Sequence, residues 1–142
     1  MIFLDTDHLT ALKYRGSARE IRLTGRLDAA SAAGEIIGTT VVNVEEQMRG
    51  WLAAIAKERQ PRRQVASYRD LAGLFDFFRG FAIGLFDDSA ADLFAGFSAI
   101  RIKATDRKVA AITIVQNALL LTANKRDFEQ VPGLRFENWM DP

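Results

Sequence analysis

Carboxylates follow three of the apolar, strand-like segments of this sequence. Asp5 comes directly after the run at residues 2–4, Glu46 lies shortly after the β-branched run at residues 35–42, and Asp127 follows the run at 118–122. A fourth acid, Asp106, opens a helical pattern. Sites in open α/β sheets form at the carboxyl ends of the strands, so we expect these four acids to converge if the strands are neighbours.

The chemistry of such a cluster is that of hard oxygen ligands. The sequence has no cysteine and one histidine, His8, so carboxylates without sulfur favour Mg²⁺ or Mn²⁺ over zinc. No phosphate-binding loop, dinucleotide-binding glycine motif or serine elbow is present, which indicates phosphate chemistry through metal-activated water. For His8 itself, beside Asp7, we expect a surface or helix-capping role.

Each acid also has an ordinary structural explanation. Glu46 lies three residues after Asn43, the spacing of a capping box, and Asp106 in a first helical turn suits the helix dipole. Asp7 is a natural cap for the helix that follows it. These explanations account for single residues and leave open why the acids follow successive strands.

Composition limits what can position these residues. The chain has 142 residues, which we expect to form a single domain over residues 1–142. No apolar run approaches the roughly 20 residues of a membrane span, and the short apolar start lacks a basic flank, so we expect a cytoplasmic protein without a membrane partner. Lys and Arg number 19 against 18 Asp and Glu, so any polyanion must be held locally.

Strand-like and helical patterns alternate along the chain. This alternation predicts a three-layer α/β/α sandwich around a central, mainly parallel sheet, because parallel neighbours need helical crossovers. We expect Ser17, Asn43 and Pro61 to mark helix starts. The predicted strands are 2–4, 35–42, 81–86, 118–122 and 134–138, and the predicted helices are 8–16, 17–34, 43–60, 61–80, 87–100, 105–117 and a turn at 124–130.

Four segments in this order resemble those of PIN-domain ribonucleases of the VapC toxin type, from bacterial toxin-antitoxin pairs. The segments are "FLDTD", "TTVVNVEEQMRG", "IKATDRKVAAI" and "LLLTANKRDFEQVPGLRFENW". The resemblance implies a PIN-like fold and gives Asp5, Glu46 and Asp106 as metal-binding acids, with Asp127 and Asn124 completing the site around Thr122. Glu45 falls outside the pattern, and Asp7 is expected to cap the following helix and hold its turn.

The same resemblance implies an endoribonuclease that hydrolyses RNA phosphodiester bonds with Mg²⁺ or Mn²⁺. It also implies a homodimer and a small antitoxin partner seated in a hydrophobic groove, for which the aromatic residues of "LFDFFRGF" are candidates; packing of Phe75, Phe78 and Phe81 in the core is equally compatible with their spacing. Possible contacts to RNA phosphates are the basic residues that flank two of the motifs, Lys103, Arg107, Lys125 and Arg126.

Two other functions remain open at this point. One is an RNA-binding PIN module without turnover. The other is a haloacid-dehalogenase-like phosphatase, in which Asp5 is a nucleophile and Asp7 an acid. That family expects Thr or Val two residues after the second Asp, where this chain has Leu9, and it leaves Glu46 unused.

Overall fold

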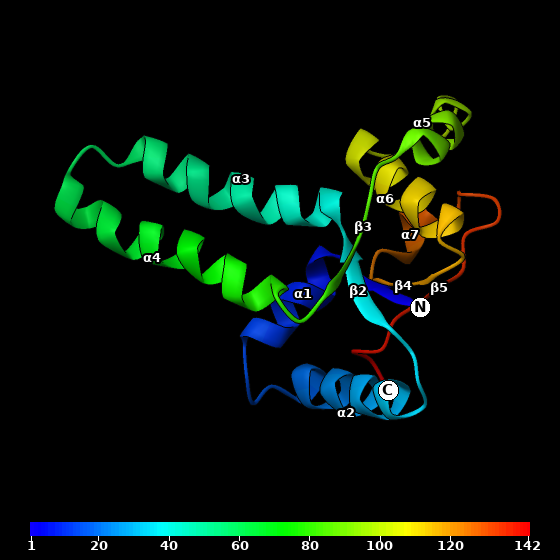
Figure 1. Ribbon diagram of the computed structural model, residues 1–142, viewed down its shortest axis with the longest axis horizontal. Helices are drawn as coiled ribbons and strands as arrows, with labels where there is room; N and C mark the ends of the chain where they lie inside the picture. Colours follow the sequence, from blue (N-terminus) through cyan, green and yellow to red (C-terminus); the bar gives the residue numbers. More distant parts are fainter.

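A five-stranded sheet runs through the middle of the molecule and carries helices on both faces (Figure 1). The computed structural model describes residues 1–142. The strand order is β3-β2-β1-β4-β5, and all four pairings are parallel. The strands are β1 (Ile2–Leu4), β2 (Ile37–Thr40), β3 (Ala82–Gly84), β4 (Leu119–Leu121) and β5 (Phe136–Glu137).

Seven helices connect and cover these strands. No helix is both long and apolar enough to cross a membrane. The helices are α1 (Thr6–Lys13), α2 (Ala18–Ala32), α3 (Val41–Lys57), α4 (Pro61–Phe78), α5 (Asp88–Ala95), α6 (Ala104–Val115) and α7 (Lys125–Phe128).

Alternate residues of β1 divide the core into two layers. Phe3 packs in a cluster with residues of α5, α6 and α7, whereas Ile2 and Leu4 pack in a second cluster with residues of α1, α2 and α4. Successive side chains of a strand point to opposite faces, so β1 contributes to both layers and is buried between them. The predicted three-layer α/β/α arrangement is therefore confirmed, with a sheet that is parallel throughout.

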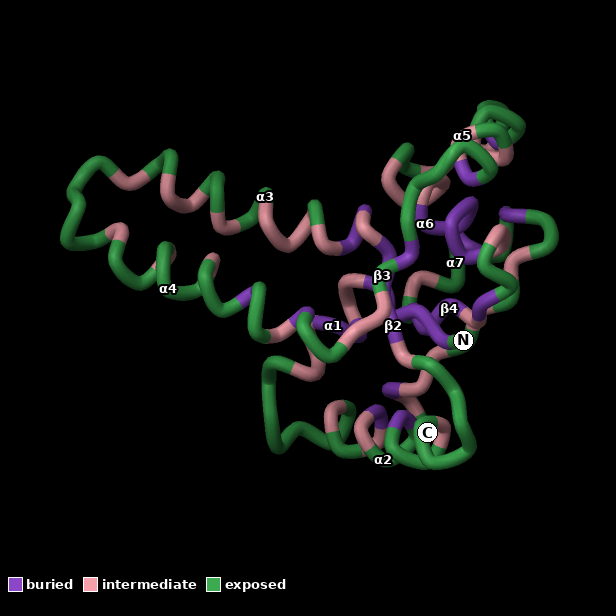
Figure 2. The backbone as a smooth tube through the Cα atoms, in the orientation of Figure 1, coloured by how far each residue is buried: buried purple, intermediate pink, exposed green.

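Helices α3 and α4 form an arm that extends away from the sheet (Figure 1). Its base is buried against the body, and exposed positions dominate toward its far end (Figure 2). The connection between the two helices, residues 58–60, is the tip of the arm.

Two predicted caps are wrong. Helix α3 begins at Val41, and its cap is Thr40, whose Oγ1 accepts the backbone N–H of Asn43 at 3.2 Å. Asn43 therefore lies inside the first turn and not before it. Helix α1 begins at Thr6, with Asp5 at the cap position, so Asp7 lies within that helix. In both cases the helix starts directly at the end of the strand, earlier than the polar residues suggested.

Other predicted starts are confirmed. Ser17 Oγ accepts the backbone N–H of Glu20 at 3.0 Å at the start of α2, and Pro61 is the first residue of α4. The predicted strands 81–86 and 134–138 shorten to Ala82–Gly84 and Phe136–Glu137, and the predicted strand 35–42 ends at Thr40. The predicted helix 87–100 ends at Ala95.

Candidate active site

The carboxyl ends of β2, β1 and β4 lie side by side because these strands are neighbours in the sheet. Asp5 follows β1, Thr40 ends β2 and Thr122 follows β4. The condition for convergence of the predicted acids is thus met.

Asp5 lies at the centre of this edge and is only 8% exposed. Its Oδ2 accepts a hydrogen bond from Thr122 Oγ1 at 2.8 Å, and its Oδ1 accepts one from Asn43 Nδ2 at 2.8 Å. Burial, and then the nearby charge of Asp7, raise the pKa of Asp5, while these hydrogen bonds act in the opposite direction. Asp5 is therefore a fixed carboxylate in an environment that resists its negative charge.

Asp106 lies within electrostatic reach of the other three predicted acids. It lies in the first turn of α6 and its pKa is raised to about 6. Burial is the largest cause, followed by the charges of Asp5, Glu46 and Asp127. Three acids from other segments of the chain therefore disfavour the negative charge of Asp106.

Polar neighbours hold two of the other acids. Thr6 Oγ1 donates to Glu46 Oε2 at 2.6 Å, and Asn124 Nδ2 donates to Asp127 Oδ2 at 3.0 Å. The capping box predicted between Asn43 and Glu46 does not form, since the Glu46 carboxylate bonds to Thr6 of another helix. Glu46 is thus oriented toward the end of β1.

The donor set suits a divalent cation held through oxygen. No group of three or more His, Cys, Asp or Glu side chains is drawn together closely enough in this structure to enclose an ion. Mg²⁺ usually keeps several waters and is bound directly by one or two carboxylates, so a spaced acidic cluster matches its needs. The mutual repulsion that raises the pKa of Asp106 is the electrostatic feature that a cation relieves.

Asp7 and His8 have roles that differ from those predicted. His8 is fully buried and is neither a surface residue nor a cap: its Nδ1 contacts Asp7 Oδ1 at 2.6 Å, and its Nε2 accepts the backbone N–H of Trp139 at 3.3 Å. Both ring nitrogens of His8 are therefore occupied by hydrogen-bond partners. His8 therefore joins the end of β1 to the C-terminal segment.

Asp7 holds the loop after β4. Its Oδ2 accepts the backbone N–H of Ala123 at 2.8 Å, so it binds a backbone donor as predicted, but one from a distant segment and not from its own helix. Burial opposes its ionisation, yet hydrogen bonds from His8 and Ala123 lower the pKa of Asp7. Asp7 is a structural carboxylate beside the acidic cluster.

Two residues at this edge were missed by reasoning from the sequence. Asn43 was interpreted only as a cap, and Thr6 was not singled out, yet Asn43 Nδ2 reaches both Asp5 Oδ1 and, at 3.2 Å, Thr6 Oγ1. The only signal was the three-residue spacing of Asn43 and Glu46, which puts both side chains on one side of the helix.

The four predicted basic residues lie in different environments. Lys103, Lys125 and Arg126 are exposed near the acids. Arg107 is already engaged: its Nη1 donates to the carbonyl oxygens of Phe97 and Ser98, each at 3.3 Å. Arg107 is half-buried and its Nη1 is already bonded, so it is less accessible than the other three.

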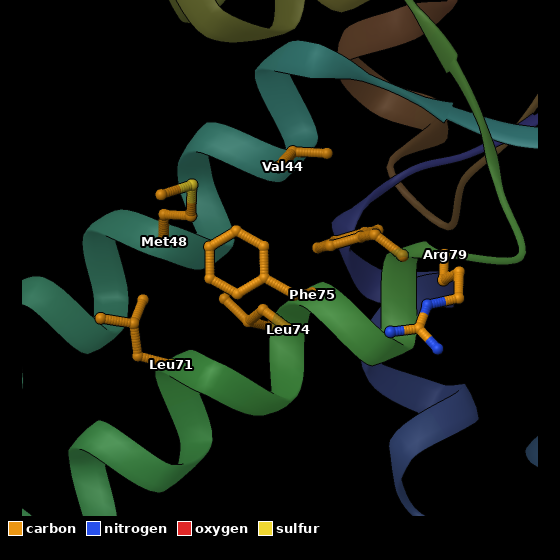
Figure 3. A pocket seen from close by; sticks show the side chains of 7 residues that line it. Val44, Met48, Leu71, Leu74, Phe75 and Arg79 are labelled. Atoms are coloured by element: carbon orange, nitrogen blue, oxygen red, sulfur yellow. The ribbon is translucent and has the colours of Figure 1, made fainter.

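An apolar cleft of about 350 Å³ lies between α3 and α4, away from the acids. In Figure 3 Val44 and Met48 on α3 face Leu71 and Phe75 on α4 across this cleft. Phe75 is 68% exposed, whereas Phe78 at the bottom of the cleft is buried. Of the predicted groove aromatics, Phe75 and Phe78 line the cleft, and Phe81 packs against Phe77 and Phe78.

No protein-family model and no curated protein sequence matches the chain. Solved structures match its fold over nearly the whole length. VapBC2 from Rickettsia felis, bound to a promoter DNA fragment, matches with a TM-score of 0.74 and 20% identity, over 98% of this chain and 99% of that chain. DNA-bound VapBC from Salmonella typhimurium matches with a TM-score of 0.74 and 20% identity, over 97% of both chains.

A third match is FitAcB from Neisseria gonorrhoeae, with a TM-score of 0.68 and 19% identity, over 98% of this chain and 99% of that chain. At these identities the likeness concerns the fold, and it agrees with the strand order β3-β2-β1-β4-β5. The chain therefore has the PIN-like α/β fold, which it shares with the VapC-type toxins of such toxin-antitoxin complexes.

Proposed function

We propose that the chain is a Mg²⁺- or Mn²⁺-dependent endoribonuclease and the toxin of a toxin-antitoxin pair. The observation that carries this proposal is the hydrogen-bonded convergence at the carboxyl ends of β1, β2 and β4, where Asp5 is held by Asn43 and Thr122 at 2.8 Å each and Glu46 is held by Thr6 at 2.6 Å; the nearby charges that raise the pKa of Asp106 support it. Acids that only cap separate helices have no reason to lie close together, whereas acids that bind one cation must do so. The PIN-like fold supports the same proposal by analogy.

In this mechanism the protein supplies orientation and negative charge. Thr122 and Asn43 hydrogen-bond to the two oxygens of Asp5, and Thr6 hydrogen-bonds to one oxygen of Glu46. These bonds hold both carboxylates in fixed orientations at the carboxyl-end edge of the sheet. A bound divalent ion supplies the charge that acidifies water and balances the charge developing on the scissile phosphate. Asp127, held by Asn124, and Asp106 would then act through waters of the ion, since Mg²⁺ takes only one or two carboxylates directly.

The proposal extends to a small antitoxin and to a second copy of the chain as partners. The apolar cleft between α3 and α4, with Phe75 exposed at its side, has the character of a seat for an apolar segment of an antitoxin. Structures of the same fold are toxin-antitoxin complexes, one of them from Klebsiella pneumoniae.

Cleavage of short structured RNAs tests the activity. Products should form with Mg²⁺ or Mn²⁺, disappear with EDTA and form poorly with Ca²⁺, whose looser geometry suits the site less well. Glu46→Gln should abolish cleavage, whereas its neighbour Glu45→Gln, at an exposed position of the same helix, serves as the matched control.

Three outcomes would contradict the proposal. Cleavage that persists undiminished in EDTA would contradict the metal dependence. RNA binding without turnover in any metal would favour a binding module, and turnover of a small phosphoester in place of RNA would favour a phosphatase with Asp5 as nucleophile.

A further inference from the structure

The tip of the α3–α4 arm concentrates positive charge. Lys57, Arg59, Arg62 and Arg63 are all exposed, and Glu58 is the one acid among them. None of the four basic residues belongs to an ion pair of the structure. The chain as a whole is nearly neutral, so this charge is a local feature.

The start of α4 lies in this tip and adds to its positive potential. The first turn holds Arg62 and Arg63 and no acidic residue, and the cap residue Gln60 makes no side-chain hydrogen bond to it. The positive end of a helix dipole disfavours cations, so this arrangement works against helix stability. The Glu58 carboxylate accepts the backbone N–H of Gln60 at 3.0 Å and offsets part of this positive charge; a phosphate bound at the tip would offset more, since it meets both the dipole and the guanidinium groups.

The tip is aligned with the acidic cluster along α3. Lys57 lies 11 residues after Glu46, which is about three turns of helix at 3.6 residues per turn, so both residues lie on the same side of α3. The distance along the axis is about 17 Å. Between them on this side lie Gly50 and Ala53, which are exposed and too small to block a bound strand.

A hollow of about 340 Å³ opens beside Glu46 on this path. Gln47, Gly50 and Trp51 line it together with Glu46. A Cβ atom added to Gly50 meets no atom within 4 Å, so the surface there is open. The indole of Trp51 is an aromatic wall of the kind on which a nucleobase stacks.

We propose that this side of the arm is a track for single-stranded RNA. The strand leaves the acidic cluster, crosses the hollow at Gly50 and Trp51, and binds through its phosphates to the basic tip. A separation of about 17 Å corresponds to about five stacked nucleotides at 3.4 Å each, and fewer if the strand is extended. The inference rests on the proposed ribonuclease function. It adds that a good substrate must continue for several nucleotides beyond the cleaved bond, on the side that lies along the arm.

Binding and cleavage of two single-stranded RNAs, of 12 and 4 nucleotides, test the track. The test variant is Arg59→Gln/Arg62→Gln/Arg63→Gln, and the charge-matched control is Arg15→Gln/Arg19→Gln/Arg26→Gln, which removes three exposed arginines around α2. Affinity is measured by fluorescence anisotropy in EDTA over a range of salt concentrations, and KM is measured in Mg²⁺.

The test variant should bind the 12-nucleotide RNA at least tenfold more weakly than the wild type, with a correspondingly higher KM. The slope of log affinity against log salt should be shallower by about 2, since three phosphate contacts are lost. The test variant should bind the 12-nucleotide RNA no more tightly than the 4-nucleotide RNA, whereas the control variant should still prefer the longer RNA as the wild type does. Melting of the test variant should be unchanged or slightly higher, because cations leave the positive end of α4.

The possible failures are distinguishable. If the wild type cleaves RNA and the test variant matches it in KM and salt slope, the track is wrong and the ribonuclease proposal stands. If the wild type cleaves neither RNA, the ribonuclease proposal fails, and the binding data still decide whether the tip holds RNA. Unchanged RNA affinity with lost binding to phosphatidylglycerol vesicles would overturn the track in favour of a membrane contact.

Discussion

Asn43 donates a hydrogen bond from Nδ2 to Oδ1 of Asp5 at 2.8 Å, linking the first turn of α3 to the end of β1. The Oδ1 atom of Asn43 accepts in turn from Thr40 Oγ1 at 2.7 Å. Thr40 thereby fixes the amide, and the amide fixes the carboxylate. A residue whose spacing suggested a helix cap positions the central acid of the candidate site.

Asn43→Ala should lower the free energy of unfolding by about 1–3 kcal/mol, because the buried Asp5 carboxylate and the Thr40 hydroxyl each lose a partner. It should also reduce RNA cleavage by the folded protein. Denaturant titration and a cleavage assay measure both effects. Asn124→Ala, which frees the half-buried Asp127, is the control and should cost less stability. An equal or smaller cost for Asn43→Ala would contradict its positioning role.

Asp106→Asn should melt at or above the wild-type temperature at pH 7.5 in EDTA. The folded-state pKa of Asp106, about 6, exceeds its ordinary value of 3.8, so the contribution of this one group to wild-type stability is full below about pH 4 and is lost as pH rises through 6. The asparagine side chain cannot ionise, so the free energy of unfolding of Asp106→Asn does not fall in this pH range for this reason. After solvent screening the gain is about 1 kcal/mol, or roughly 2–4 °C in melting temperature.

Asp88→Asn is the control for this measurement. Asp88 is an exposed acid in the first turn of α5, where loss of a favourable helix-dipole interaction should destabilise slightly at every pH above 5. If Asp106→Asn behaves like Asp88→Asn, then Asp106 acts only as a first-turn acid and the acidic cluster is misplaced.

Mg²⁺ should raise the melting temperature of the wild type more than that of Asp106→Asn. A ligand that binds only the folded state stabilises it by mass action, by about 2.7 kcal/mol at a hundredfold excess over Kd. Thermal melts with increasing Mg²⁺ measure the difference, and Glu45→Gln should respond like the wild type. Parallel responses of the wild type and Asp106→Asn would exclude Asp106 as a ligand.

His8→Gln should destabilise the protein by about 1–3 kcal/mol but keep RNA cleavage by the folded fraction within tenfold of the wild type. The cost arises because a buried side chain loses its fitted bonds to Asp7 and to the backbone of Trp139. Activity is normalised to the folded fraction from circular dichroism. A loss beyond about a hundredfold would instead identify His8 as a general acid or base.

The layered fold could be predicted from the sequence because its signals are local. Short apolar runs separated by helical patterns indicate buried parallel strands, and β1, β2 and β4 lie where these runs stand. Val41 and Val42 show where such signals fail. Both are β-branched and extend the strand pattern, yet they open α3, because the hydroxyl of Thr40 caps a helix at that point.

The adjacency of the strand ends that Asp5 and Thr122 follow could be predicted as well, because the carboxyl ends of neighbouring parallel strands share one edge, and the joint metal-binding role of the acids stays a prediction. The contacts of His8 and Thr6 could not be predicted. They depend on how side chains meet across 131 residues for His8 and Trp139, and across 40 residues for Thr6 and Glu46. Residue spacing along one segment carries no information about such contacts.

The central place of β1 in the sheet determines when the site can assemble during protein synthesis. Asp5 is synthesised before both of its partners: Asn43 follows 38 residues later and Thr122 follows 117 residues later. Contacts between such distant segments form late and slowly in folding. The segment around Thr122 must therefore be synthesised before both oxygens of Asp5 have their hydrogen-bond partners, so a growing chain holds an incomplete site until that segment has left the ribosome.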